Sequence, residues 1–124
     1  SNPWLSIDPL LAIPDLRRRI RSSGVPVIGV SPIVGGRAIK GPTAKIMSEL
    51  GLAIDPLAVL EHYAGLCDAW VLDRADASLA ARCPVPVLVT ETVMQTLASK
   101  EQLARDVVAF AERVARASAR SSPP

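Results

Sequence analysis

Three short apolar runs constrain the fold of this chain more than any other feature, because each is hydrophobic at both odd and even positions. They are PVIGV at 26–30, AWVLD at 69–73 and PVLVT at 86–90. A strand with one solvated face alternates apolar and polar residues, whereas a strand buried on both faces is apolar throughout. The runs therefore predict three strands of a sheet that is covered on both sides.

Helical patterns lie between and after these runs. We expect helices within the following segments: 13–24, 41–51, 55–66, 76–82 and from residue 99 onward. Asp15 and Asp55 are candidate N-caps, and Pro42 and Pro56 stand at the first helical position. Strands that alternate with helices form right-handed crossovers and a parallel sheet. The prediction is an α/β fold whose thin sheet is part of a larger domain.

The segment after residue 98 has the clearest helical pattern. Ser99 and Gln102 match a capping box. Four apolar residues then recur at helical spacing: Leu103, Val107, Phe110 and Val114. This stripe predicts a helix with one face on the core. The end of the chain, residues 119–124, is predicted to be a flexible tail.

Composition excludes several classes of protein. The 124 residues are 49% hydrophobic and carry a net charge of only +2, which argues against a dedicated nucleic-acid binder. We expect no membrane span and a cytoplasmic location, because no apolar run reaches about 18 residues and no signal-peptide pattern appears. Cys67 and Cys83 are predicted to be reduced, buried thiols.

The stretch SPIVGGRAIKGP at 31–42 is the main candidate for a binding loop. It follows a predicted strand and precedes a predicted helix, and ligands of open α/β sheets bind beyond the carboxyl ends of the strands. Gly35 and Gly36 allow positive φ and close approach of backbone N–H groups to an anion. Arg37 and Lys40 add positive charge. Neither GxGxxG nor Gly-Lys-Ser/Thr is present, so a phosphate loop and a structural turn both remain open.

Other polar residues have less specific interpretations. SNPWLSI at 1–7 offers hydroxyl and amide groups, but a frayed terminus is the better interpretation without further context. The basic run at 17–21 is interpreted as a solvated helix face. His62 is interpreted as a packed or exposed residue rather than a catalyst, since no serine or cysteine is placed to form a triad with it.

Polar residues also follow the second and third predicted strands. Asp73 ends a strand, where it can bind a metal or a sugar hydroxyl or cap the next helix, and we favour the cap. Thr90 and Thr92 follow the last strand. They can reach a ligand at that edge of the sheet, or Thr90 can cap the next turn, and both interpretations stay open.

Four stretches, taken in order, resemble the C-terminal part of the 2-phospho-L-lactate transferase family. They are SNPWLSIDPLLAIPDLR, VSPIVGGRAIKGPTAKIMSELG, HYAGLCDAWVLDRAD and VLVTETVM. The resemblance covers nearly the whole chain, and SPIVGG followed by KGP is its most specific element. It implies a Rossmann-like α/β fold and assigns residues 1–118 to the C-terminal part of that domain. The family's N-terminal half is absent.

The resemblance also implies a function. Such enzymes transfer a phospholactyl or phosphoenolpyruvyl group from a guanosine diphosphate-linked donor to the deazaflavin FO, releasing GMP, in coenzyme F-420 biosynthesis. They require magnesium and are usually homodimers. The absent half would hold the metal ligands and much of the FO pocket, so this segment alone is expected to be inactive. The binding residues that it implies are Ser1, Asn2, Pro3, Ser6, Ser31, Pro32, Gly35, Gly36, Lys40, Gly41 and Pro42.

Two alternatives to a transferase remain. The chain can belong to a relative that binds a nucleotide-linked metabolite without turnover, or it can be an α/β module used for assembly. Acidic metal ligands in the absent half would favour the transferase.

Overall fold

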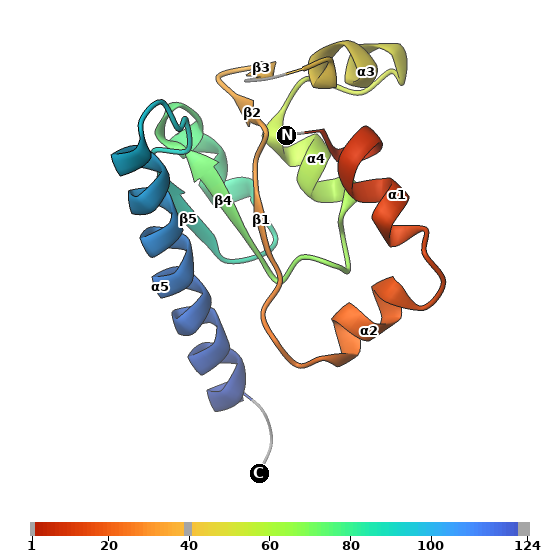
Figure 1. Cartoon of the computed structure of the whole chain (residues 1–124). Coiled ribbons are helices and arrows are strands. Elements are labelled where there is room, and N and C mark those ends of the chain that lie inside the picture. Colours follow the sequence, from red (N-terminus) through yellow and green to blue (C-terminus); the bar gives the residue numbers. More distant parts are fainter. Residues whose placement is uncertain (1, 39–40, 122–124) are drawn as a thin grey trace.

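The computed structural model describes residues 2–38 and 41–121 and confirms the α/β prediction. Three parallel strands form a sheet in the order β1 (Ile28–Val30), β4 (Ala69–Asp73) and β5 (Val87–Thr90), as Figure 1 shows. The strand at 69–73 has the predicted bounds, and the other two begin one or two residues later than predicted. A parallel sheet with flanking helices is the architecture expected of a Rossmann-like fold.

Helical segments surround this sheet and differ in length. They are η1 (Pro3–Ile7), α1 (Asp8–Leu11), α2 (Leu16–Ser22), α3 (Thr43–Glu49), α4 (Pro56–His62), η2 (Arg74–Arg82) and α5 (Leu97–Ser121). α5 runs along the side of the sheet opposite to α4 (Figure 1). It includes residues 119–121 of the predicted tail, and residues 122–124 lie outside the described part of the chain.

The central strand β4 divides the hydrophobic core into two clusters. Trp70 and Leu72 pack on the side of α3 and α4, together with Met47, Val59 and other apolar residues. Ala69 and Val71 point the other way and pack against Phe110 of α5. All five residues of β4 are buried, which explains why this run is apolar at both parities.

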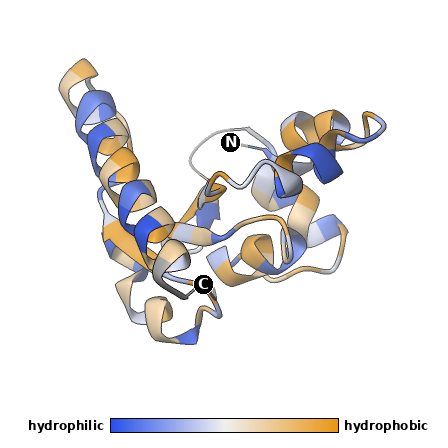
Figure 2. Cartoon of the chain, turned by 90° about the horizontal axis from the view of Figure 1, so that it is seen from below, coloured by the Kyte–Doolittle hydropathy of each residue, from blue (hydrophilic) through white to orange (hydrophobic). Residues whose placement is uncertain are grey.

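The predicted apolar stripe of α5 is confirmed. Leu103 and Phe110 are buried, and Val107 and Val114 pack against the same cluster. Figure 2 shows apolar and polar residues alternating along this helix, as an amphipathic helix on a sheet requires. The helix nevertheless begins earlier than predicted. Thr96 Oγ1 accepts from the Ser99 N–H at 3.1 Å and Ser99 Oγ accepts from the Thr96 N–H at 2.9 Å, so Thr96, not Ser99, is the cap.

The start of the chain is ordered, so the interpretation of 1–7 as a frayed terminus is wrong for the described residues. Asn2 is buried, and its Oδ1 accepts from the Leu5 N–H at 3.1 Å. Pro3 follows at the first helical position. An Asn cap followed by proline is a helix-start pattern, and it begins η1 here.

The stretch at 31–42 contains a β-hairpin, where the sequence indicated only a loop. β2 (Ile33–Val34) pairs antiparallel with β3 (Arg37–Ala38) across a two-residue Gly-Gly turn. Gly35 and Gly36 have φ of 58° and 80°, which confirms the predicted positive φ and is what a type I′ turn needs.

Of the two aspartates predicted to cap short helices, one forms its cap and the other does not. Asp55 caps α4 as expected, with Oδ1 accepting from the Leu57 N–H at 2.6 Å. Asp15 precedes α2 but has φ of 67° and makes no capping bond, because its carboxylate instead pairs with Arg18. Pro42 stands at the N-cap of α3 rather than at the first helical position.

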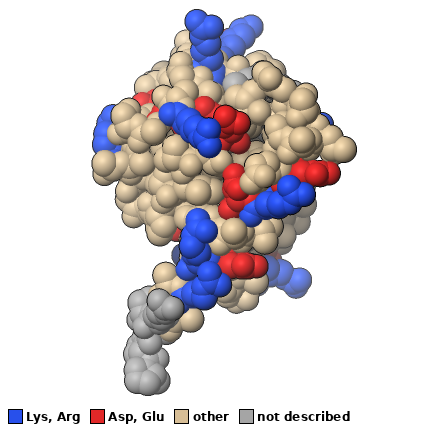
Figure 3. Space-filling view, turned by 90° about the vertical axis from the view of Figure 1, so that its left-hand side faces the viewer, with Lys and Arg blue, Asp and Glu red and all other residues tan. Residues whose placement is uncertain are grey.

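Among the described residues, the charged side chains and the two cysteines show no unusual arrangement. On the face that Figure 3 shows, basic and acidic side chains are interspersed and neither sign dominates. Cys67 and Cys83 are both free and half-buried, and burial raises the pKa of each thiol. Within residues 2–38 and 41–121, no helix has the length and apolar character needed to cross a membrane.

Candidate functional site

A cavity of about 530 Å³ lies beside β1 and is the candidate site. Segments that are distant in the sequence meet there: the chain's start, β1 and the residues after it, α4 with the turn that follows, β4, and the residues between β5 and the first turn of α5. The lining residues are Asn2, Pro3, Ile7, Val27, Ile28, Gly29, Val30, Ser31, Pro32, Val59, Tyr63, Leu66, Cys67, Trp70, Thr92, Met94 and Lys100.

Three polar residues of this lining follow the carboxyl ends of the strands in the chain. Ser31 directly follows β1, Thr92 stands two residues after β5, and Lys100 lies in the first turn of α5. Because the strands are parallel, their carboxyl ends meet at one edge. The chain's start reaches the same end of the molecule, near β2 (Figure 1). The cavity runs along β1 and reaches the carboxyl edge, where ligands of open α/β sheets bind.

Two buried donors in the lining have no hydrogen-bond partner. They are Asn2 Nδ2 and Trp70 Nε1, and both of the buried side-chain N or O atoms that lack a partner among the described residues belong to this cavity. Asn2 is 6% exposed and Trp70 is 2% exposed. An unpaired buried donor costs about 1–3 kcal/mol, so such groups call for an acceptor. A ligand with oxygen acceptors would supply one.

The wall of the cavity depends on a glycine in β1. A Cβ at Gly29 would lie 1.8 Å from Cζ3 of the Trp70 ring, so only glycine leaves room for the indole there. Gly29 and Trp70 are also register neighbours in β1 and β4. The indole is thus held against the strand that borders the cavity.

The sequence-predicted site residues divide into three groups. Asn2, Pro3, Ser31 and Pro32, which come from two separate segments, line the cavity together. Five others are described but do not line it: Ser6, Gly35, Gly36, Gly41 and Pro42. Ser1 and Lys40 lie outside the described residues, so their predicted roles stay predictions.

Internal contacts already engage part of the predicted anion loop. The Gly35 N–H donates to both oxygens of the Asp76 carboxylate, at 3.0 and 3.3 Å. Ser31 is buried, and its hydroxyl donates to the Ile33 carbonyl at 2.9 Å and accepts from the Ile33 N–H. The hairpin is therefore anchored to η2 through a carboxylate that occupies an anion position at its turn.

Asp73 caps the start of η2, which confirms the interpretation that the sequence favoured. Its carboxylate accepts from the Ala75 N–H at 2.9 Å and from the N–H and hydroxyl of Thr92 at 2.9 and 3.1 Å. Burial acts to raise the pKa of Asp73, but these three hydrogen bonds outweigh it and hold the pKa below the usual value. Asp73 thereby fixes Thr92, which lines the cavity. The Thr90 hydroxyl donates to Asp106 of α5 at 2.8 Å, a contact that ties the end of β5 to that helix.

The described residues do not fit a metal site. No group of three or more His, Cys, Asp or Glu side chains within 2–38 and 41–121 is arranged to hold a metal ion. Asp73 and Asp76, the buried carboxylates near the carboxyl edge, are both committed to internal donors. The described residues therefore offer no ligand set for magnesium.

A cluster of three side chains holds the chain's start against α4. His62 Nε2 lies 2.7 Å from Asp8 Oδ2, and the Tyr63 hydroxyl donates to Asp8 Oδ1 at 3.0 Å. The Trp4 ring lies 5.0 Å from the His62 ring. Burial, and then the hydrogen bond to Asp8, raise the pKa of Tyr63 well above its usual range. The packed histidine predicted from sequence is thus a structural contact that positions one wall of the cavity.

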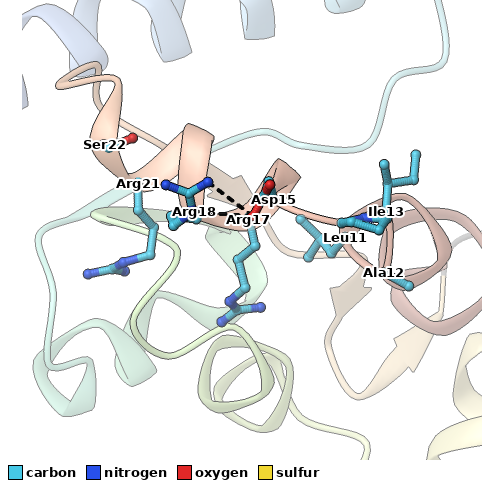
Figure 4. Close-up of a pocket in the computed structure, with 9 residues that line it drawn as sticks. Leu11, Ala12, Ile13, Asp15, Arg17, Arg18, Arg21 and Ser22 are labelled. Atoms are coloured by element: carbon cyan, nitrogen blue, oxygen red, sulfur yellow. Dashed lines mark hydrogen bonds and ion pairs between the residues drawn. The ribbon is translucent and has the colours of Figure 1, made fainter.

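A second hollow, of about 680 Å³, lies between α1 and α2 (Figure 4). It is lined by residues of one continuous stretch, and all of these except Leu11 are exposed. Arg18 is paired with Asp15, while Arg17 and Arg21 extend away from that pair (Figure 4). No sequence-predicted site residue lies there, and the basic run is a solvated face as expected.

The fold and the cavity define a Rossmann-like α/β protein with a cavity at the carboxyl edge of its sheet. The chain belongs to the 2-phospho-L-lactate transferase CofD family, whose model matches residues 1–85. It is 38% identical over 118 residues to a phosphoenolpyruvate transferase of Streptomyces coelicolor. It is 36% identical over 110 residues to a 2-phospho-L-lactate transferase of Methanocaldococcus jannaschii.

These alignments cover most of this chain but a minor part of the relatives. They include 92% and 89% of this chain, and 37% and 35% of the two relatives. The chain therefore spans little more than a third of the length of the curated relatives that it matches.

Sequence patterns do not identify several of the residues that line the cavity. Trp70 read as a core residue of a buried strand, and Lys100 read as a solvated residue off the apolar stripe of its helix. Neither carries a local signal for a site, because the cavity depends on how β1, β4 and α5 meet. The sequence leaves the role of Thr92 open between two interpretations, and its position after β5 is the signal that favours the site.

Proposed function

We propose that this chain is part of an enzyme that transfers a phospholactyl or phosphoenolpyruvyl group in coenzyme F-420 biosynthesis. The donor is a guanosine diphosphate-linked three-carbon acid, the acceptor is the deazaflavin FO, and GMP is released. One observation carries the proposal: Asn2 and Ser31, from two segments inside the family match, line a single cavity at the carboxyl edge.

The chemistry is transfer at phosphorus. The FO hydroxyl attacks the β-phosphorus of the donor and loses its proton, the bond from that phosphorus to the bridging oxygen breaks, and GMP leaves with the oxygen. Negative charge on the phosphoryl and leaving oxygens is stabilised by fixed donors and cations. The described residues supply the Asn2 amide, the Trp70 indole N–H and the Lys100 ammonium group. Their role is to bind and orient the donor.

The proposal divides the work between this chain and the rest of a longer protein. We propose that this chain supplies one wall of the donor site, while FO and magnesium are held mainly elsewhere. The chain alone should then bind GDP without catalysing transfer.

The test is GMP release by the full-length protein that contains this chain, supplied with FO, magnesium and either donor. We expect GMP and the phospho-linked deazaflavin in equal amounts, measured by chromatography. No GMP with either authentic donor would contradict the transferase. Transfer by residues 1–124 alone would contradict the division of work.

A further inference from the structure

Lys100 is the one cation that lines the cavity among the residues that the structure describes. It comes from the first turn of α5, outside the part of the chain that the family model matches. The described lining also contains no carboxylate. An anion in the cavity would therefore meet a positive charge without an acidic competitor.

Its place on the helix keeps this ammonium group available. Pairs on a helix surface form between residues three or four apart, and the neighbours of Lys100 at those spacings are Leu97, Leu103, Thr96 and Ala104. Lys100 accordingly makes no ion pair within 2–38 and 41–121. Arg105, one turn further on, is paired with Glu101 at 3.5 Å.

The buried Asn2 amide is the second, independent observation. Its Nδ2 has no acceptor among the described residues, and it lines the same cavity. Its orientation is fixed, because Oδ1 accepts from the Leu5 N–H. A held N–H donor and a mobile ammonium group together suit a ligand with several anionic oxygens.

We propose that Lys100 binds the diphosphate oxygens of the donor nucleotide, with the Asn2 amide as a fixed second donor. This inference rests on the proposed function and adds a residue that sequence patterns do not identify. Diphosphate is favoured over a single carboxylate because the two donors come from different segments of the lining, and a diphosphate offers more oxygens than a carboxylate does. Lysine acts here as a point charge, so arginine should replace it in part.

The test compares the binding of GDP, guanosine and inorganic pyrophosphate to residues 1–124 by calorimetry. Lys100→Ala should weaken GDP about tenfold, the size of one charge-assisted hydrogen bond, and leave guanosine unchanged. Lys100→Arg should keep most of the GDP affinity. Arg105→Ala, on the same helix but outside the lining, is the matched control and should bind like wild type.

The outcomes separate this inference from the proposed function. If wild type binds GDP and Lys100→Ala binds it equally well, or loses GDP and guanosine alike, the role of Lys100 is wrong and the function stands. If wild type binds pyrophosphate through Lys100 but not GDP, the anion site stands and the guanosine nucleotide is wrong. If wild type binds neither, the anion site in this cavity is overturned, and GMP release by the full-length protein decides the function separately.

Discussion

The cavity beside β1 and the hollow between α1 and α2 have similar volumes, but they differ in which segments line them and in how buried that lining is. The hollow, at about 680 Å³, is the larger, yet it comes from residues 11–22 alone and its lining is almost wholly exposed. The cavity, at about 530 Å³, joins distant segments and contains buried donors without partners. Size alone therefore does not mark a site. Buried polar groups that the tertiary fold holds in place are a better indicator of a binding site than volume is.

The largest expected effect comes from filling the cavity wall. Gly29→Val would place side-chain atoms within the Trp70 ring position, and relief of that overlap must displace the indole. We expect a loss of about 3 kcal/mol in the free energy of unfolding, the upper range for overpacking a core. Urea denaturation measures it.

Ala12→Val is the matched control, since it adds a branched side chain to the exposed hollow and should leave the unfolding midpoint unchanged. Equal destabilisation by both substitutions would break the distinction between the two regions.

The second-largest effect is expected from loss of the Asp73 carboxylate, which holds Thr92 in place. Asp73→Ala removes the acceptor of three donors, and we expect a loss of about 2 kcal/mol in the free energy of unfolding. The same substitution should weaken GDP binding, because Thr92 lines the cavity.

The contribution of Asp73 should also depend on pH. Its pKa in the folded chain is lowered from about 3.8, so its stabilising effect is present above that value and is lost as pH falls below it toward the folded pKa. The stability difference between wild type and Asp73→Ala, measured in urea from pH 6 down to pH 2, should shrink below about pH 4. A difference that stays constant throughout would show that Asp73 acts without its charge.

The contact that positions the chain's start should have a smaller effect. His62→Ala removes the 2.7 Å contact to Asp8 and the packing on Trp4, and we expect a loss of about 1 kcal/mol. Because η1 carries Asn2 and Pro3 into the cavity, hydrogen exchange of the Leu5 and Ser6 amides should become faster. Unchanged exchange there would show that η1 is held by other contacts.

The smallest effect is expected in the hollow. Arg18→Ala breaks an exposed ion pair with Asp15, and such pairs contribute little. Neither the melting temperature nor GDP affinity should change. A GDP affinity that depends on Arg18 would move the site to the hollow between α1 and α2.

Sequence patterns predicted the sheet well, because runs buried on both faces are recognisable without tertiary information. The Asp55 cap and the stripe of α5 are likewise local signals. The sequence interpretation misses the hairpin at 33–38 although Gly-Gly after the apolar pair Ile33-Val34 is a two-residue turn signal, because it considers the stretch for its charges. The cap of α5 was placed three residues late, since Thr96 and Ser99 cap each other and either fits the pattern.

The candidate site was predictable only in part. The family resemblance implies Asn2, Pro3, Ser31 and Pro32, which line one cavity, and their binding role stays a prediction. Lys100 and Trp70 were not found, because their places in the lining follow from the packing of α5 and β4. Long-range packing of this kind has no local pattern to detect.

We propose that the cavity beside β1 binds the nucleotide through its unpartnered donors, Asn2 Nδ2 and Trp70 Nε1. The chain has two tryptophans, so the two indole N–H signals in a nitrogen–proton correlation spectrum can be assigned with one substitution, Trp4→Phe. On titration with GDP, the Trp70 indole and Asn2 side-chain amide signals should shift saturably and together, with little change at Trp4. Shifts confined to the Arg17, Arg18 and Arg21 side chains, with Trp70 and Asn2 unmoved, would contradict the account.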